Sequence, residues 1–330
     1  MSVPAPAPVT PADLHAAAGR MTGVAHRTPV LTCSTLDQLA GRRLFFKCEN
    51  FQKVGAFKFR GALNAVSQIA ETEAARGVVT HSSGNHAQAL ALAARMRGVP
   101  AFIVMPDTAS PVKRAAVEGY GAEVILCEST LAARETTADE VQERTGATFI
   151  HPYDHPHIIA GQGTAALELI EQAQASGTTL DAVITPVGGG GLLSGTCIAA
   201  RSATPALRVF AAEPTGADDA ARSMNAGRLI PQTDPNTIAD GLLTSLGKLT
   251  WPVIRDHVEQ IMTVTDGQIV AAMRLLWERA KLLVEPSSAV VLAAVLDDRS
   301  RDRLHGVESL GLILSGGNVN LNALPFSRTP

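Results

Sequence analysis

The 330-residue chain lacks the features that mark several classes of protein. Aromatic residues make up only 4% of it, and its four cysteines form no C-x-x-C pair. Cysteines so far apart favour reduced thiols over a disulfide framework or a zinc site. The net charge is −3, from 28 basic and 31 acidic residues, and no run of five basic residues occurs. We therefore expect neither nucleic acid nor an anionic membrane surface as a partner.

Membrane, export and common catalytic signals are also missing. No apolar run approaches the roughly 20 residues of a membrane-spanning helix. Residues 1–11 alternate proline with alanine and have no apolar signal-peptide core, so they predict a flexible arm. There is no G-x-S-x-G hydrolase elbow and no Gly-Lys-Ser/Thr of a Walker A loop. With 46% hydrophobic residues, the sequence predicts a cytoplasmic globular protein of two domains or one large one.

Short β-rich runs alternate with helical patterns along most of the chain. Repeated βαβ units predict an α/β fold built on parallel sheets, with Gly98, Gly121 and Gly146 ending helices. Residues 78–151 predict a small αβ domain, inserted into a larger domain of residues 1–77 and 152–330. Residues 214–250 are rich in proline, glycine, aspartate and threonine and are expected to be mainly loop. Expected strands cover residues 44–47, 78–81, 102–105, 124–127, 148–151, 182–187, 209–212 and 312–314. Expected helices cover residues 62–69, 87–97, 112–118, 131–144, 192–203, 268–283 and 287–296.

Four consecutive glycines, residues 188–191, stand between a predicted strand and a predicted helix. Glycines there let the backbone approach an anion, and a helix N-terminus offers free N–H groups, so this glycine loop predicts a phosphate site. A purely structural turn is the simpler alternative. The loop also nearly matches the dinucleotide fingerprint, with Ser194 at the third glycine and Glu213 about 20 residues on. An NAD-dependent dehydrogenase therefore remains open at this point.

Two further polar loops follow predicted strands, at residues 82–86 and 315–318. Because ligands of open α/β sheets bind at the carboxyl ends of strands, we expect the three loops to converge on one ligand. Lys58 lies between Phe57 and Phe59, and partial desolvation would favour its neutral, nucleophilic amine. The alternative is a solvated lysine at a helix start. A phosphate site together with a reactive lysine is what pyridoxal phosphate requires.

Two groups of residues, one acidic and one of histidines, are candidates for metal binding. Glu213 and the pair Asp218 and Asp219 could supply oxygen ligands for Mg²⁺ or Ca²⁺, although a solvated acidic loop has the same composition. Residues 151, 155 and 157 are histidines, but they lack the helical spacing of a metalloprotease. We expect a loop without metal there.

Taken together, these motifs resemble the serine racemase and serine/threonine dehydratase (threonine ammonia-lyase) family of pyridoxal phosphate enzymes. The resemblance runs from about His26 to Asn318 and implies fold type II (tryptophan synthase β-like), with two domains, the cofactor between them and a homodimer. Ala56 departs from the serine that commonly precedes the lysine. The motifs are residues 57–62, 82–86, 160–164, 188–191, 212–214, 237–241, 283–286 and 315–318.

The resemblance implies a role for each matching residue. Lys58 would hold pyridoxal 5′-phosphate through a Schiff base and Phe57 would pack beneath its ring. Asn85 would contact the ring hydroxyl and Ser315 the pyridine nitrogen. The phosphate would lie on Gly188, Gly189, Gly190 and Gly191. The substrate carboxylate would be bound by Ser82, Ser83, Gly84, Asn85 and His86. A divalent cation, Mg²⁺ or else Ca²⁺ or Mn²⁺, would be held by Glu213, the Ala217 carbonyl and Asp219.

The implied reaction is α,β-elimination of L-serine or L-threonine to a 2-oxo acid and ammonia, with Lys58 removing the α-proton. Serine racemisation stays open because Ser83 could return a proton to the opposite face. Alternatives are a threo-3-hydroxyaspartate ammonia-lyase, for which Arg134 is a candidate side-chain cation, and a predominantly amino-acid racemase. A cofactor carrier without turnover is the non-enzymatic alternative.

Overall fold

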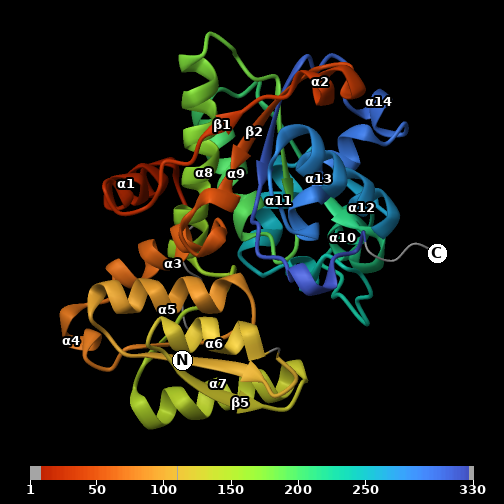
Figure 1. The fold of residues 1–330 in the computed structure, drawn as a ribbon. Helices are drawn as coiled ribbons and strands as arrows, with labels where there is room; N and C mark the ends of the chain where they lie inside the picture. Colours follow the sequence, from red (N-terminus) through yellow and green to blue (C-terminus); the bar gives the residue numbers. More distant parts are fainter. Residues whose placement is uncertain (1–8, 110, 327–330) are drawn as a thin grey trace.

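A computed structural model describes residues 9–109 and 111–326 and divides the strands between two sheets (Figure 1). The larger sheet has six strands in the order β1-β2-β10-β7-β8-β9. Strand β1 is antiparallel to β2, and all other neighbours are parallel. Its strands are β1 (Val30–Leu31), β2 (Arg43–Cys48), β7 (Ala182–Pro186), β8 (Arg208–Pro214), β9 (Gln260–Val264) and β10 (Ser309–Leu314).

The smaller sheet has four parallel strands in the order β5-β4-β3-β6. All four come from residues 78–149, whereas the sequence on both sides contributes to the larger sheet. The predicted α/β fold with parallel sheets is therefore confirmed. The domain boundaries at residues 78 and 151 stay a prediction. The strands are β3 (Val78–His81), β4 (Ala101–Pro106), β5 (Glu123–Cys127) and β6 (Thr148–Phe149).

Helices cover both sheets, with α4 to α7 around the smaller one in the lower half of Figure 1. No helix of the described ranges is long and apolar enough to cross a membrane. The helices are α1 (Pro11–Met21), α2 (Ser34–Ala40), α3 (Lys58–Ser67), α4 (Glu71–Ala74), α5 (Asn85–Arg97), α6 (Pro111–Gly119), α7 (Leu131–Thr145), α8 (Pro156–Ala175), α9 (Gly191–Ala203), α10 (Asp219–Ala226), α11 (Thr250–His257), α12 (Asp266–Leu275), α13 (Pro286–Leu296) and α14 (Ser300–Arg303). Short helical turns are η1 (Glu49–Phe51), η2 (Lys53–Gly55), η3 (Thr215–Ala217), η4 (Asp240–Leu242), η5 (Leu276–Ala280) and η6 (Leu321–Ala323).

The larger sheet is buried on both faces. Val183 and Val209 pack into a core shared with helices α8 and α9, while the neighbouring Ile184 and Phe210 pack into a second core with α12 and α13. This arrangement explains why its strands read as continuous hydrophobic runs rather than alternating patterns. Because β7, β8 and β10 are parallel, their carboxyl ends lie along one edge of the sheet, where the polar loops emerge.

Several sequence predictions need correction. Residues 214–250 are mainly loop, as expected, although helix α10 forms within them and ends at Gly227 in the left-handed conformation (φ 65°). The helix predicted over residues 268–283 leaves α geometry at Leu276 and ends where Lys281 adopts a φ of 59°. The strand predicted over residues 148–151 ends at Phe149. Of the predicted arm, residues 1–8 lie outside the described ranges, whereas Thr10 caps helix α1 through a capping box with Asp13.

Helix α8 was not predicted from the sequence, and its glycines explain both why its pattern is weak and how it packs. Gly161 and Gly163 lower helix propensity, yet they let neighbouring helices approach closely. A Cβ on Gly161 would lie 2.6 Å from the Arg60 carbonyl oxygen on α3. A Cβ on Gly195 of α9 would lie 2.5 Å from the Gly163 nitrogen. Helix α8 therefore joins the helix that carries Lys58 to the helix that follows the glycine loop.

The close contact between α8 and α9 gives a stability prediction. Gly195→Ala places a Cβ against backbone atoms that cannot move aside, so we expect a loss of about 1–3 kcal/mol and a lower urea midpoint. Gly119→Ala is the control, since a Cβ there meets no described heavy atom within 4 Å. The control should leave the midpoint unchanged or raise it slightly. Equal midpoints for Gly195→Ala and the unmodified protein would contradict the packing.

Candidate active site

Lys58 is the first residue of helix α3, and the segment before it is fastened to the loop after β10. The Phe57 N–H donates to the Ser315 carbonyl oxygen at 2.9 Å, and Ala56 forms an antiparallel bridge with Gly316. The preceding turn requires left-handed conformations at Val54 (φ 57°) and Gly55 (φ 68°). These constraints bring two motifs, about 260 residues apart in sequence, to one place and fix where the helix begins.

The Lys58 side chain is half-buried. Its Nζ donates to the Pro152 carbonyl oxygen at 2.9 Å and lies 5.3 Å from the centroid of the Phe57 ring. Burial lowers the pKa of Lys58 to about 8, opposed by the negative charge of Glu285. Phe59 does not form the second side of a sandwich as expected. Its ring is fully buried, with the Lys53 ammonium 5.8 Å from its centroid.

The glycine loop joins β7 to α9 and is lined by backbone because neighbours leave no room for side chains. A Cβ on Gly189 would lie 2.2 Å from the ring of Tyr153, and one on Gly190 would lie 2.8 Å from the Thr250 hydroxyl. Gly190 caps the helix at a φ of 87°, which favours glycine. The first N–H groups of this thirteen-residue helix can bind an anion. The loop therefore has the geometry expected of a phosphate site.

A buried amide beside the loop also points to a bound group. Gln162 of α8 is fully buried, and among the described residues neither its Oε1 nor its Nε2 has a hydrogen-bond partner. A Cβ on Gly191 would lie 2.6 Å from Oε1, and one on Gly61 would lie 3.2 Å from Nε2. An unpaired buried polar group costs about 1–3 kcal/mol. A phosphate or its water shell at the glycine loop would supply the missing partner, so these residues fit the cofactor that the sequence implies.

Asn85 belongs to a cluster that unites the other two polar loops. Its Nδ2 donates to Glu285 Oε1 at 2.9 Å, and its Oδ1 accepts from Asn318 Nδ2 at 2.8 Å. The Asn318 side chain also donates to the Val54 carbonyl oxygen at 2.7 Å, beside the Lys58 segment. Burial, and then the charge of Asp240, raise the pKa of Glu285 to about 7. Individual roles for Glu285 and Asn318 were not predictable from the sequence, because both act through contacts distant in sequence.

Ser83, from the loop at residues 82–86, helps to line a cavity of about 430 Å³ together with Thr108, Lys113 and Asn318. The Gly84 N–H donates to the Ser82 hydroxyl at 3.4 Å, which holds the loop in a tight turn. His86 is buried behind the loop, with its Nε2 3.4 Å from the Ile150 carbonyl oxygen, and burial holds its pKa well below the usual range. Its imidazole is therefore neutral and does not add a positive charge to the cavity.

The predicted metal ligands lie at the end of β8 and in the two elements that follow it. Glu213 Oε1 accepts from the Ala221 N–H at 2.7 Å, and Asp219 Oδ2 accepts from the Leu246 N–H at 3.1 Å. Burial raises the pKa of Glu213 to about 9 and that of Asp219 to about 6. Ala217 is buried in the intervening turn η3. Among the described residues no group of three or more His, Cys, Asp and Glu could hold a metal ion.

One histidine of the connecting loop has a positional role that the sequence did not reveal. His151 Nδ1 accepts from the Tyr153 N–H at 3.3 Å and from the Asp154 N–H at 2.9 Å. The Asp154 carboxylate in turn accepts from the Leu249 N–H at 2.8 Å, just before α11. These bonds fix the loop that carries the Pro152 carbonyl and lays Tyr153 against the glycine loop.

The pKa of Lys58 yields a prediction that needs no bound cofactor. Trace acetylation of the full-length chain, read by mass spectrometry of the peptide that contains Lys58, measures how its neutral fraction varies with pH. Because burial disfavours the ammonium, labelling should rise with pH through an inflection near 8. An inflection near the ordinary value of about 10.4 would contradict the buried position of Nζ.

Comparison with known proteins agrees with this geometry. Residues 21–316 match the family model described as pyridoxal-phosphate dependent enzyme. The chain is 51% identical to a serine racemase from Dictyostelium discoideum, covering 96% of this chain and 97% of the relative. That protein's crystal structure superimposes with a TM-score of 0.90, over 96% of this chain and 100% of that one.

Two further relatives are described by other activities. A β-hydroxyaspartate dehydratase from Paracoccus denitrificans is 48% identical over 96% of this chain and 98% of its own length. The T.th. threonine deaminase is 45% identical, with a TM-score of 0.89 over 94% of this chain and 99% of that one. The family match overturns the dehydrogenase interpretation of the glycine loop, and the neighbours confirm the predicted type II fold. The chain belongs to the family of pyridoxal-phosphate dependent enzymes.

Proposed function

We propose that the chain catalyses α,β-elimination of L-serine or L-threonine to a 2-oxo acid and ammonia, with serine racemisation as a second outcome. The observation that carries the proposal is the desolvated Lys58 amine, held at the Pro152 carbonyl oxygen beside the glycine loop and the Asn85 cluster. Relatives described as serine racemase and threonine deaminase support these substrates.

The residues of the site divide the binding of pyridoxal phosphate and substrate among them. Lys58 Nζ would bond to the cofactor, Phe57 would pack on its ring, and Asn85 and Ser315 would contact its ring hydroxyl and nitrogen. The N–H groups of residues 188–191 would bind the phosphate, with Gln162 alongside. When bound, the cofactor delocalises the electron pair left on the substrate α-carbon after proton removal. The backbone and side chains of residues 82–86 would orient the substrate carboxylate.

Proton transfer would depend on Lys58 and Ser83. An amine with a pKa of about 8 is partly neutral at physiological pH, so Lys58 Nζ can accept the α-proton and afterwards donate it to a leaving hydroxyl. Loss of water followed by hydrolysis gives the 2-oxo acid and ammonia. Ser83 Oγ, on the wall of the cavity, would return a proton to the opposite face of the α-carbon and give the other enantiomer. The ratio of products then depends on which residue protonates first.

We further propose a Mg²⁺ site at Glu213, the Ala217 carbonyl and Asp219, with waters completing the shell. The support is electrostatic: two buried carboxylates lie close together, and burial raises the pKa of both. A divalent cation would hold them ionised and would fasten β8 to helix α10. Ca²⁺ and Mn²⁺ would satisfy the same oxygen ligands.

A 3-hydroxyaspartate substrate is the second candidate, favoured by one relative and one observation. The relative is the β-hydroxyaspartate dehydratase, and the observation is a cation in the cavity. Lys113 lines the cavity with Ser83 and pairs with Asp240 Oδ2 at 2.8 Å. A second substrate carboxylate could compete for that ammonium. Arg134, the candidate from sequence, lies on α7 with its Nε 3.3 Å from the Thr130 carbonyl oxygen.

A substrate panel tests the proposed function. Holoenzyme would receive L-serine, D-serine, L-threonine and threo-3-hydroxyaspartate, with 2-oxo acid and enantiomeric composition followed together. We expect turnover of serine or threonine, and a loss of at least about 10²- to 10⁴-fold in Lys58→Ala because the base is removed. Lys53→Ala, a neighbouring lysine over Phe59, is the matched control and should retain activity. Turnover of the hydroxyaspartate alone would favour the second candidate, and no turnover of any substrate would contradict the proposal.

The metal proposal predicts a ligand-dependent change in thermal stability. At Mg²⁺ concentrations of about 100 Kd, binding to the folded state adds about 2.7 kcal/mol, so the melting temperature should rise. Glu213→Gln keeps an acceptor for the Ala221 N–H but loses the charge, and should abolish the rise. Asp218→Asn, whose carboxylate pairs with Arg222 at 2.7 Å, is the control and should keep it. An equal rise in both variants would refute this location for the ion.

A further inference from the structure

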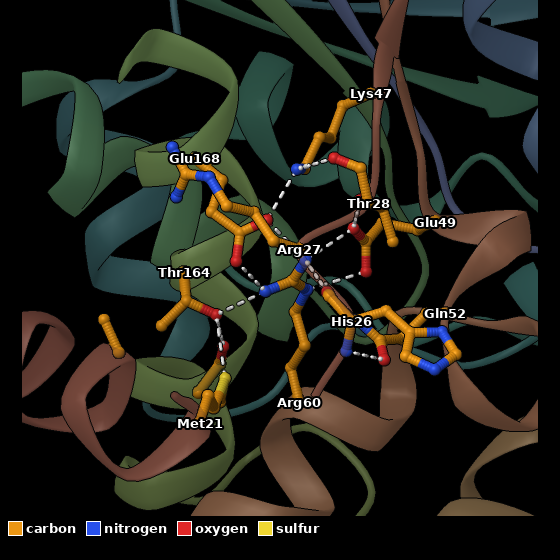
Figure 2. A network of polar contacts seen from close by, with 12 residues as sticks. Met21, His26, Arg27, Thr28, Lys47, Glu49, Gln52, Arg60, Thr164 and Glu168 are labelled. Carbon is orange, nitrogen blue, oxygen red and sulfur yellow. Dashed lines mark hydrogen bonds and ion pairs between the residues drawn. The ribbon is translucent and has the colours of Figure 1, made fainter. Parts of the chain in front are cut away.

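A buried ionic network includes one residue of α3, the helix that carries Lys58 (Figure 2). Its centre is the Arg60 guanidinium, whose side chain is completely buried. Arg60 forms paired bonds to Glu49, at 2.7 Å from Nε to Oε2 and 2.8 Å from Nη2 to Oε1. It forms a second pair to Glu168, at 2.8 Å from Nη1 to Oε1 and 2.9 Å from Nη2 to Oε2. Two carboxylates therefore bind one guanidinium from two sides.

The network continues away from α3 through Lys47. The Lys47 side chain is also completely buried, and its Nζ donates to Glu168 Oε2 at 2.6 Å, the Thr28 carbonyl oxygen at 2.7 Å and Gln172 Oε1 at 2.8 Å. The Thr28 hydroxyl donates to Glu49 Oε1 at 2.5 Å. Two cations thus balance two carboxylates, and the donors and acceptors have partners within the network.

Stability alone does not account for this arrangement. Taking four charges out of water carries a large desolvation penalty, and well-packed apolar side chains are often as stable or more stable in such places. Paired guanidinium–carboxylate bonds fix the orientation of the two groups that they join, which apolar packing does not do. The location of the network shows what that orientation would control.

Arg60 and Lys58 occupy the first turn of α3, two residues and therefore about 200° apart around the helix. While Arg60 reaches back to the network, Lys58 reaches the Pro152 carbonyl oxygen on the other side. Glu49 opens the turn η1 ahead of the segment that leads to Lys58, and Glu168 belongs to α8, which begins shortly after Pro152. The network therefore contacts the turn before the Lys58 segment and helix α3 itself. It also contacts helix α8, which follows the Pro152 carbonyl that accepts from Lys58.

We propose that Arg60 is a positioning residue whose bonds to Glu49 and Glu168 fix the rotation and depth of α3, so that Lys58 Nζ faces the reacting carbon. This inference rests on the proposed function, in which Lys58 is the reactive amine. A displacement of about 1 Å at such a group can cost about 10²-fold in rate. Rotation of α3 would also move the amine toward water, and its neutral fraction at a given pH would fall.

Matched variants separate positioning from mere stability. Arg60→Met and Lys47→Met each remove one buried cation from the same network, but only the first lies on α3. Arg60→Met with Glu49→Gln removes one charge of each sign, which leaves the Lys47–Glu168 pair and favours folding. Arg60→Lys keeps the positive charge but loses the planar guanidinium that forms paired hydrogen bonds to a carboxylate. The measurements are kcat and KM of the holoenzyme, the melting temperature, and the pH inflection of Lys58 trace acetylation in the full-length chain.

The Arg60 double variant should lose at least about tenfold in kcat with KM little changed, and its acetylation inflection should move upward from about 8. Lys47→Met should lower the melting temperature but keep both kcat and the inflection. Arg60→Lys should have a higher melting temperature than Arg60→Met but an equally low kcat. If the double variant does not fold, Arg60→Lys is compared with Lys47→Met in its place. Equal kcat and inflection in the Arg60 and Lys47 variants would overturn the inference. An inactive unmodified protein whose Lys58 still titrates near 8 would instead count against the proposed function.

Discussion

The hydrogen bond between the Lys58 ammonium and the Pro152 carbonyl oxygen is the interaction around which the site is arranged. It holds an amine whose pKa burial lowers to about 8 close to the loop that follows β10. Each partner needs its own support. Lys58 is held by the bridge from Ala56 to Gly316 and by the first turn of α3, and Pro152 is held by the bonds that His151 accepts.

Close helix packing makes this support possible. The glycines of α8 and α9 let α3, α8 and α9 approach until backbone meets backbone, so the amine, the glycine loop and the buried network form one rigid unit. Elimination and racemisation both require an amine whose position is fixed before substrate arrives, and this unit provides it.

Local patterns in the sequence predicted the strands, the glycine loop and Lys58, because each depends on neighbours in the chain. Residues that act through distant contacts were not predictable in the same way. Glu285 meets Asn85 from 200 positions away, and Arg60 meets Glu168 from 108 positions away. Tyr153 and Gln162 contribute to the site by packing against glycines of the glycine loop. The role of Phe59 was misjudged, since sequence adjacency to Lys58 does not specify the direction of a ring on a helix.

We propose that Lys58, among all the lysines, bonds to the cofactor. Borohydride reduction of the purified holoenzyme, followed by digestion and mass spectrometry, tests it directly by fixing the linkage where it exists. We expect one reduced cofactor per chain, found on the peptide that contains Lys58. A reduced cofactor on the peptide of any other lysine, or none on a chain that turns over substrate, would contradict it.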